Sequence, residues 1–112
     1  MQELPVINRT QELYECVCKI TSKLSALNQQ TIGRRLEDDI LQLLELLIMA
    51  KYAPKAHKGA YLIKASAMIE IIQFQLRILL TQKLANETTL HQLQAKVMEI
   101  GRMVGGWRKS VQ

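Results

Sequence analysis

The chain has few of the residues that build β-sheets, disulfide frameworks or membrane spans. Of its 112 residues only 4% are aromatic, with 5 glycines, 2 prolines and 2 cysteines. This composition favours helices over sheets. Lys64, Glu70 and Arg77 interrupt the longest apolar runs, so no stretch of about 18 apolar residues predicts a membrane span. Cys16 and Cys18 lie two residues apart in one predicted helix, so their side chains point to different faces and cannot form a disulfide with each other. We therefore expect free thiols.

The side-chain sets that catalysis and metal binding require are also missing. Di-iron bundles use Glu-x-x-His pairs, whereas His91 follows Glu87 by four positions and His57 has no acidic residue nearby. No strand is predicted, so no glycine-rich phosphate loop follows one. We therefore expect a protein that is not an enzyme, with no metal, no cofactor and no small-molecule substrate.

Length and the first residues suggest a simple organisation. A chain of 112 residues is expected to form one domain over residues 1–112. Residues 1–5 lack the basic region and the apolar run of a secretory signal. We therefore expect a cytoplasmic protein.

Apolar residues at steps of three and four predict helices along almost the whole chain. The predicted helices span residues 8–28 (or 10–28), 31–52, 59–85 and 90–107. Thr31 is expected to cap the second helix, Pro54 to end it, and Thr89 with Gln92 to form a capping box for the fourth. Short connections force antiparallel neighbours, so the predicted fold is an all-α, up-down-up-down antiparallel four-helix bundle.

Each predicted helix carries an apolar stripe for the bundle core. The first helix has its stripe at Leu13, Val17, Ile20, Leu24 and Leu27. The second helix has one at Leu36, Ile40, Leu43 and Leu47, and the third at Leu62, Ala65, Ile69, Ile72, Leu76 and Leu79. The stripe of the fourth helix is Leu90, Leu93, Val97, Ile100, Val104 and Trp107.

The second and third helices have more apolar surface than one core needs. A second stripe consists of Leu41, Leu44 and Ile48, and another of Ile63, Ala67, Ile71, Phe74 and Ile78. A monomer would expose them as a large patch, so we predict a homo-oligomer. Arg77 is expected to pair with Glu45 or Glu70, within the bundle or across a subunit boundary. The predicted interface residues are Ile63, Ile71, Phe74, Arg77 and Ile78.

Basic residues outnumber acidic ones, 15 to 10, for a net charge of +5. Such a balance indicates an acidic partner, with nucleic acid as the first candidate. Antiparallel topology gathers seven cations beside His57 at one end, namely Lys51, Lys55, Lys58, Lys64, Arg102, Arg108 and Lys109. Favourable helix dipoles explain cations near helix C-termini, such as Lys51. They do not explain Lys55, Lys58 and Lys64, so a phosphate-binding surface is the alternative interpretation.

The C-terminal stretch breaks the helical pattern with Gly101, Gly105 and Gly106, directly before Trp107. A glycine inside a helix costs about 1 kcal/mol relative to alanine. We therefore expect that the helix ends here or that another segment approaches its backbone closely, with Trp107 as part of a docking surface.

These residues carry a family resemblance. The segment Glu99-Ile-Gly-Arg-Met-Val-Gly-Gly-Trp107 resembles the closing motif of a family of small four-helix-bundle proteins. That family includes the accessory variability determinant of diversity-generating retroelements and proteins encoded in intervening sequences of bacterial 23S ribosomal RNA genes. The segment Phe74-Gln-Leu-Arg-Ile-Leu-Leu80 is similar to its aromatic-x-Leu-Arg-x-Leu segment. Residues 46–61 are similar too, and the resemblance covers residues 36–109.

The resemblance implies a homopentameric ring, basic on the outside, that binds RNA or DNA and the reverse transcriptase of the retroelement. That complex copies a template RNA with errors at adenines, and the accessory protein is not the polymerase. By the same resemblance, Gly101, Gly105, Gly106 and Trp107 shape the helix end, and Arg77 is a structural or interface residue. The implied contacts to RNA or polymerase are Arg102, Arg108, Lys109, Lys51, Lys55 and Lys58.

Two functions of different classes stay open. The first is a nucleic-acid-binding accessory subunit of a reverse transcriptase complex. The second is a structural oligomer of the ribosomal intervening-sequence type, with an unknown protein partner. The basic charge balance favours the first.

Overall fold

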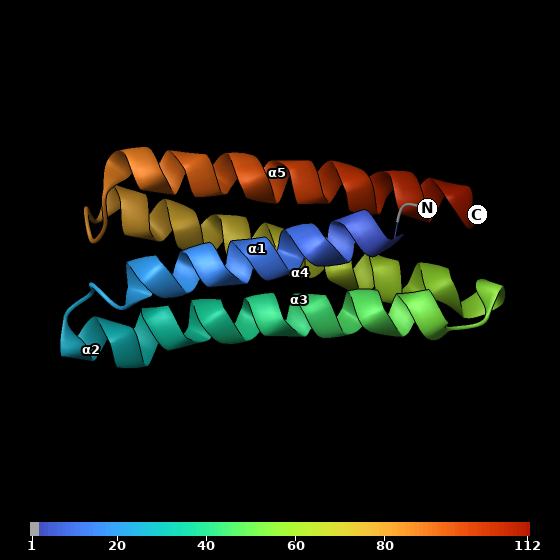
Figure 1. The fold of residues 1–112 in the computed structure, drawn as a ribbon, viewed down its shortest axis with the longest axis horizontal. Helices are drawn as coiled ribbons and strands as arrows, with labels where there is room; N and C mark the ends of the chain where they lie inside the picture. Colours follow the sequence, from blue (N-terminus) through green and yellow to red (C-terminus); the bar gives the residue numbers. More distant parts are fainter. Residues whose placement is uncertain (1–2) are drawn as a thin grey trace.

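Four long helices make up the fold, and a computed structural model describes residues 3–112, with side chains from Pro5 on (Figure 1). The elements are α1 Glu3–Thr21, α2 Ala26–Asn28, the π-helical segment η1 Gln29–Gly33, α3 Arg34–Tyr52, α4 Lys55–Thr81 and α5 Glu87–Ser110. No strand occurs within residues 3–112, which confirms the all-α prediction.

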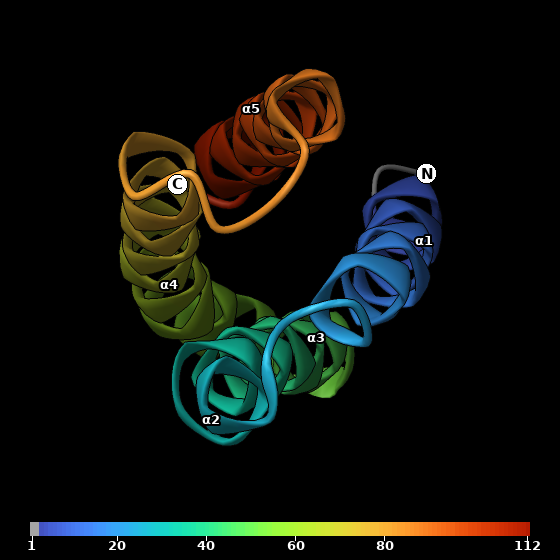
Figure 2. The same cartoon turned by 90° about the vertical axis from the view of Figure 1, so that its left-hand side faces the viewer.

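Each long helix has two neighbours in the bundle. α1 packs against α3 and α5, and α4 packs against the same two helices. Viewed along the bundle, α1 and α4 lie on opposite sides of the common core (Figure 2). Short turns reverse the chain between consecutive long helices, as the predicted topology requires (Figure 1). Within the described residues, no helix has both the length and the apolar character needed to cross a lipid bilayer.

The inner stripes of α3, α4 and α5 form the core as predicted. Every residue of the three predicted stripes is buried, beginning with Leu36 in α3, Leu62 in α4 and Leu90 in α5. In α1, Leu13 and Val17 join this core, and Leu24 is buried in the turn that follows α1. Burial of such stripes supplies most of the stability of helices that would be marginal in isolation.

The predicted first helix is wrong at its C-terminal end. α1 ends at Thr21, and the hydroxyl groups of Thr21 and Ser22 donate to the carbonyls of Cys18 and Lys19 at 3.2 and 2.8 Å. Such bonds compete with helix continuation. The side-chain amide of Gln29 then closes the turn by donating to the backbone carbonyls of Ser22 and Leu24 at 2.8 and 3.0 Å.

The helix resumes at Ala26, with Ser25 as its N-cap, and continues through η1 into α3. Thr31 is therefore not a cap, because it lies inside this continuous helix and its hydroxyl donates to the Leu27 carbonyl at 2.9 Å. Leu27 is 71% exposed and does not belong to the core stripe. Gly33 is buried, and a Cβ there would lie 3.3 Å from Leu24, so glycine lets the turn pack tightly.

α3 ends at Tyr52, as predicted, but α4 begins at Lys55 rather than residue 59. Ala53 and Pro54 are extended, with ψ near 150°, and together they redirect the chain. The fixed φ of proline is compatible with a helix that begins at the next residue, so Pro54 serves as the N-cap of α4. The Pro54 carbonyl accepts a hydrogen bond from the backbone amide of His57 at 2.8 Å.

The connection between α4 and α5 also differs from the prediction. α4 ends at Thr81, and α5 begins at Glu87 with Asn86 as its N-cap, so Thr89 is not the cap. The Asn86 carboxamide oxygen accepts the Thr89 amide and hydroxyl at 3.0 and 3.1 Å. Asparagine is the better N-cap residue of the two, which explains the earlier start. α5 then extends past Trp107 to Ser110.

Candidate nucleic-acid interface

The α3–α4 connection and the C-terminal end of α5 lie at the same end of the bundle (Figure 1). This end is called the basic end, and it carries Lys51, Lys55, Lys58, Arg108 and Lys109. The cluster also extends along the bundle. Lys64 lies nine residues into α4, about 14 Å from the start of that helix. Arg102 lies eight residues before the end of α5, about 12 Å from it. The predicted cations therefore gather over about a third of the 44 Å length of the molecule.

These cations are available to a partner. Lys55, Lys64, Arg102 and Lys109 are exposed, and Lys51 and Arg108 are half-buried. The ion pairs among the described side chains use Arg9, Arg35 and His91 as their cations, and none of the seven predicted residues. Closely spaced unpaired cations raise the local positive potential, which attracts polyanions.

Glu99, three residues before Arg102 in α5, forms an ion pair with α1. Its carboxylate lies 3.4 Å from Nε of Arg9 in α1. Arg9 also pairs with Glu12 at 3.4 Å. The acid therefore joins α5 to α1 instead of neutralising the basic end.

Lys58 has a structural position within the basic end. Its ammonium donates to the carbonyls of Ala50 and Lys51, both at 2.8 Å. These are among the last carbonyls of α3, which have no partner inside the helix. Lys58 therefore caps α3 from α4, which explains part of the cluster by folding instead of by phosphate binding.

Tyr52 is a candidate that the sequence analysis missed. It is 77% exposed at the end of α3, and Nζ of Lys51 lies 5.2 Å from the centroid of its ring. An exposed aromatic ring beside a cation is the usual platform for stacking unpaired bases. The signal in the sequence was an aromatic residue next to a lysine, just before the proline that ends the helix.

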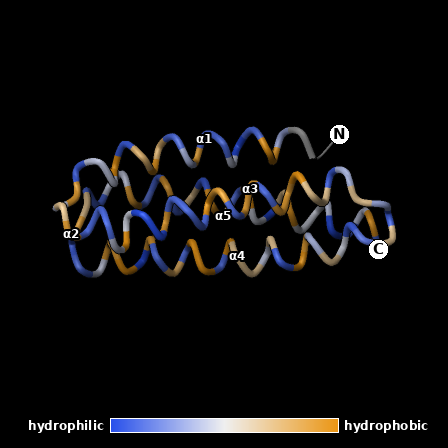
Figure 3. Tube along the Cα trace, turned by 90° about the horizontal axis from the view of Figure 1, so that it is seen from below, coloured by the Kyte–Doolittle hydropathy of each residue, from blue (hydrophilic) through white to orange (hydrophobic). Residues whose placement is uncertain are grey.

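A second surface follows the outer face of α4. Ile63, Ile71 and Phe74 are 52, 39 and 58% exposed, whereas Ile78 is half-buried. Hydrophobic and hydrophilic segments alternate along this helix (Figure 3). Arg77 lines a depression of about 460 Å³ beside Phe74. Among the described side chains Arg77 has no ion pair, so neither Glu45 nor Glu70 pairs with it inside the protomer.

α3 adds smaller exposed apolar side chains. Leu41, Ile48 and Met49 are 43, 40 and 40% exposed. The predicted surplus of apolar surface on α3 and α4 is therefore present on the protomer. Patches of this kind mark interaction surfaces in soluble proteins.

A comparison with models of protein families matches residues 5–111 to the family described as bAvd-like. The chain belongs to the bAvd-like family. The resemblance stated from the C-terminal motif is thereby confirmed, and the family indicates an accessory protein of the Avd type. No curated protein matches the chain.

The glycines of the family motif do not make the close internal contacts that we expected. A Cβ on Gly101 would lie 3.7 Å from Ile69, an ordinary packing distance, and one on Gly105 would meet nothing within 4 Å. Both lie inside α5 along with Gly106, so the helix does not end at them. Within the protomer, packing does not account for Gly101 and Gly105.

Trp107 is not part of a docking surface. It is 3% exposed and belongs to the core cluster. Its indole therefore anchors the C-terminal end of α5 inside the bundle.

The described residues also bring together no group of three His, Cys, Asp or Glu side chains able to hold a metal ion.

Proposed function

We propose that this protein is a non-catalytic accessory subunit of a diversity-generating retroelement. In this proposal it binds the template RNA and the reverse transcriptase and supports mutagenic reverse transcription in the cytoplasm. The observation that carries the proposal is the match to the bAvd-like family over residues 5–111.

The basic end supports the RNA part of the proposal. The proposed phosphate contacts are Lys51, Lys55, Lys64, Arg102, Arg108 and Lys109, with Lys58 adding charge from its capping position. Tyr52 would stack an unpaired base beside Lys51. The reverse transcriptase would contact either this end or the outer helix surfaces.

The outer face of α4 supports a homo-oligomer, which we propose to be a pentameric ring. Ile63, Ile71, Phe74 and Ile78 would meet a second copy, and Arg77 would pair across the boundary. In a ring the basic ends repeat, and several linked sites bind one RNA more tightly than one site does.

Native mass spectrometry with RNA titrated at several salt concentrations tests the proposal. A complex of five 12.8 kDa chains, about 64 kDa, with RNA bound is expected. If about four phosphates on a single strand are neutralised, log K falls with log salt at a slope near −3. RNA binding with no dependence on salt would contradict a basic phosphate-binding surface.

The second candidate is a structural oligomer of the 23S ribosomal RNA intervening-sequence type. The exposed face of α4 favours it as much as the first, since that face fits assembly alone. A ring that ignores RNA at every salt concentration would support this second function.

A further inference from the structure

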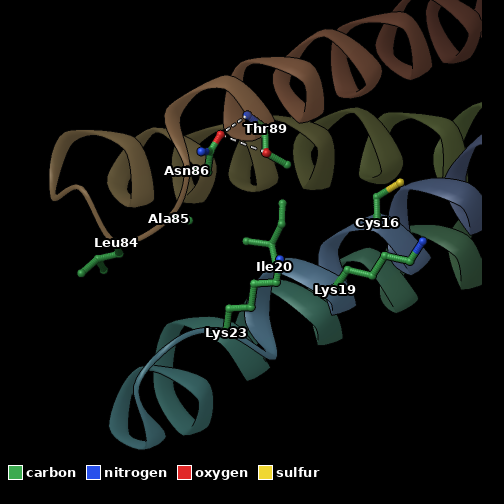
Figure 4. A pocket seen from close by; sticks show the side chains of 8 residues that line it. All are labelled: Cys16, Lys19, Ile20, Lys23, Leu84, Ala85, Asn86 and Thr89. Carbon is green, nitrogen blue, oxygen red and sulfur yellow. Dashed lines mark hydrogen bonds between the residues drawn. The ribbon is translucent and has the colours of Figure 1, made fainter.

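A groove of about 310 Å³ lies at the end of the bundle opposite the basic end (Figure 4). One wall is the C-terminal half of α1, and the other is the α4–α5 turn with the first residues of α5. Its volume is at the lower limit of ligand pockets, enough for a few apolar side chains.

The floor of the groove is apolar. Ile20, Leu84 and Ala85 line it, and all three are half-buried. Ile20 points from α1 toward Thr89 at the start of α5 (Figure 4). The sequence placed Ile20 in the core stripe; it packs against the core with part of its side chain and lines the groove with the rest.

Two lysines border this floor. Lys19 lies in α1 and Lys23 in the turn after it; both are exposed, and neither forms an ion pair among the described side chains. No acidic residue lines the groove. Glu87, the nearest acid in the sequence to its far wall, lies 3.6 Å from Nε2 of His91, a contact that is an ion pair only when the imidazole is protonated.

Two other acids at this end are engaged, whereas Glu15 and Asp38 are exposed and do not line the groove. Glu37 accepts a short hydrogen bond from Thr21, and Asp39 is buried against Arg35 and Gln75. The groove therefore combines an apolar floor with two bordering lysines and no acid in its lining. Charge complementarity selects a partner that is apolar on one side and acidic at its edges.

The groove residues of α1 are Cys16, Lys19 and Ile20, which follow the i, i+3, i+4 spacing of one helix face, and Lys23 adds its charge from the turn that follows α1. An amphipathic helix recognises its partner with the same spacing. We propose that this groove binds an acidic amphipathic helix of a protein partner. The proposal is independent of RNA binding at the basic end, since the two sites lie at opposite ends of the bundle.

Binding of a defined peptide to the full chain tests this proposal. The probe is a labelled helical peptide of about 20 residues with leucines at i, i+3, i+4, i+7 and glutamates on both flanks. A matched peptide keeps every glutamate and replaces the leucines by serine. Fluorescence anisotropy is expected to show saturable binding of the leucine peptide and at least about tenfold weaker binding of the serine peptide.

Charge reversal locates the site. The double variant Lys19→Glu/Lys23→Glu is expected to lower affinity for the leucine peptide about tenfold. The control Lys55→Glu/Lys64→Glu changes the net charge equally at the other end and is expected to leave affinity within about twofold. Equal losses in both variants would overturn the proposal, because attraction would then be general. Equal binding of both peptides would overturn it as well.

The cysteines give a second readout. Cys16 lines the groove, whereas Cys18 lines a separate depression with Thr21 and Gln29. In the single-thiol variants Cys18→Ser and Cys16→Ser, saturating peptide is expected to slow alkylation of Cys16 several-fold and leave Cys18 unchanged. Equal protection of both would place the peptide elsewhere. A lower native mass for Lys19→Glu/Lys23→Glu without peptide would show that a second copy occupies the groove, and would also overturn the proposal.

Discussion

The side-chain amide of Gln75 donates to the carboxylate of Asp39 at 2.6 Å and joins α4 to α3 inside the bundle. Both residues are buried, and Nε of Arg35 binds the same carboxylate at 3.0 and 3.1 Å. The side-chain oxygen Oε1 of Gln75 has no hydrogen-bond partner among the described residues. A buried polar pair of this kind holds two helices in one register.

This pair predicts a coupled response to mutation. Gln75→Leu removes one of the hydrogen bonds to a buried carboxylate and is expected to lower the free energy of unfolding by about 2 kcal/mol. The double variant Asp39→Leu/Gln75→Leu is expected to lose less than the sum of the single losses, since no buried group is left unpaired. Urea unfolding at a fixed protein concentration measures the cycle. Strict additivity would show that the two side chains are not coupled.

The backbone conformation of Lys83 predicts that replacing this residue by glycine stabilises the protein. Lys83 has a φ of 56°, the left-handed region that favours glycine, and the following Leu84 amide bonds the Leu79 carbonyl at 2.9 Å. The φ of Lys83 costs about 1 kcal/mol or more, so Lys83→Gly is expected to raise the free energy of unfolding by about 1 kcal/mol. Lys83→Ala is the control and is expected to gain little, because alanine carries the same Cβ penalty. Thermal unfolding of both variants checks the difference.

Lys58 and Lys55 predict opposite phenotypes despite lying three residues apart. Lys58→Met removes a cap from two carbonyls of α3 and is expected to cost about 1–2 kcal/mol of stability. Lys55→Met exposes no such group and is expected to leave stability within about 0.5 kcal/mol while weakening RNA binding. Denaturation and RNA titration on the same samples separate the two effects. Loss of stability in Lys55→Met would contradict the assignment.

Reversing Lys51 and Lys55 together by glutamate, with the capping Lys58 left in place, is expected to weaken RNA binding strongly while the oligomer stays intact. The measurement is the native mass with and without RNA. RNA binding that survives unchanged at physiological salt would exclude this end as the nucleic-acid surface. Tyr52→Ala is expected to cost about 1–3 kcal/mol of binding to single-stranded RNA, and Tyr52→Phe, which keeps the ring, far less.

The outer face of α4 predicts a change in assembly. Phe74→Asp places a charge on a side chain that is 58% exposed in the protomer, so the helix fold is expected to survive. The native mass is expected to fall toward that of one 12.8 kDa chain. Leu27→Asp is the control, since Leu27 is 71% exposed in α2 and does not belong to this stripe, and its mass is expected to stay unchanged. A Phe74→Asp variant of unchanged mass would exclude this stripe as the interface.

Hydropathy periodicity in the sequence was sufficient to predict the long helices and most of their core stripes. Both depend on local spacing, which a helix converts directly into one buried face. The end of α3 was predictable for a similar reason, since Pro54 acts on its own neighbours in the chain. The C-terminal motif was also sufficient for the family, which the match over residues 5–111 confirms.

Only the tertiary structure decided how individual polar side chains are used. The turn after Thr21 depends on bonds from Gln29, and the capping role of Lys58 depends on a helix reversal around Pro54. Asp39 lies near the start of α3, where acids are usually solvated, but it is buried because α4 brings Gln75 against it. The lysine-bordered groove likewise arises where α1 and the start of α5 meet. Such contacts join residues of different structural elements, so the periodicity of one helix carries no signal for them.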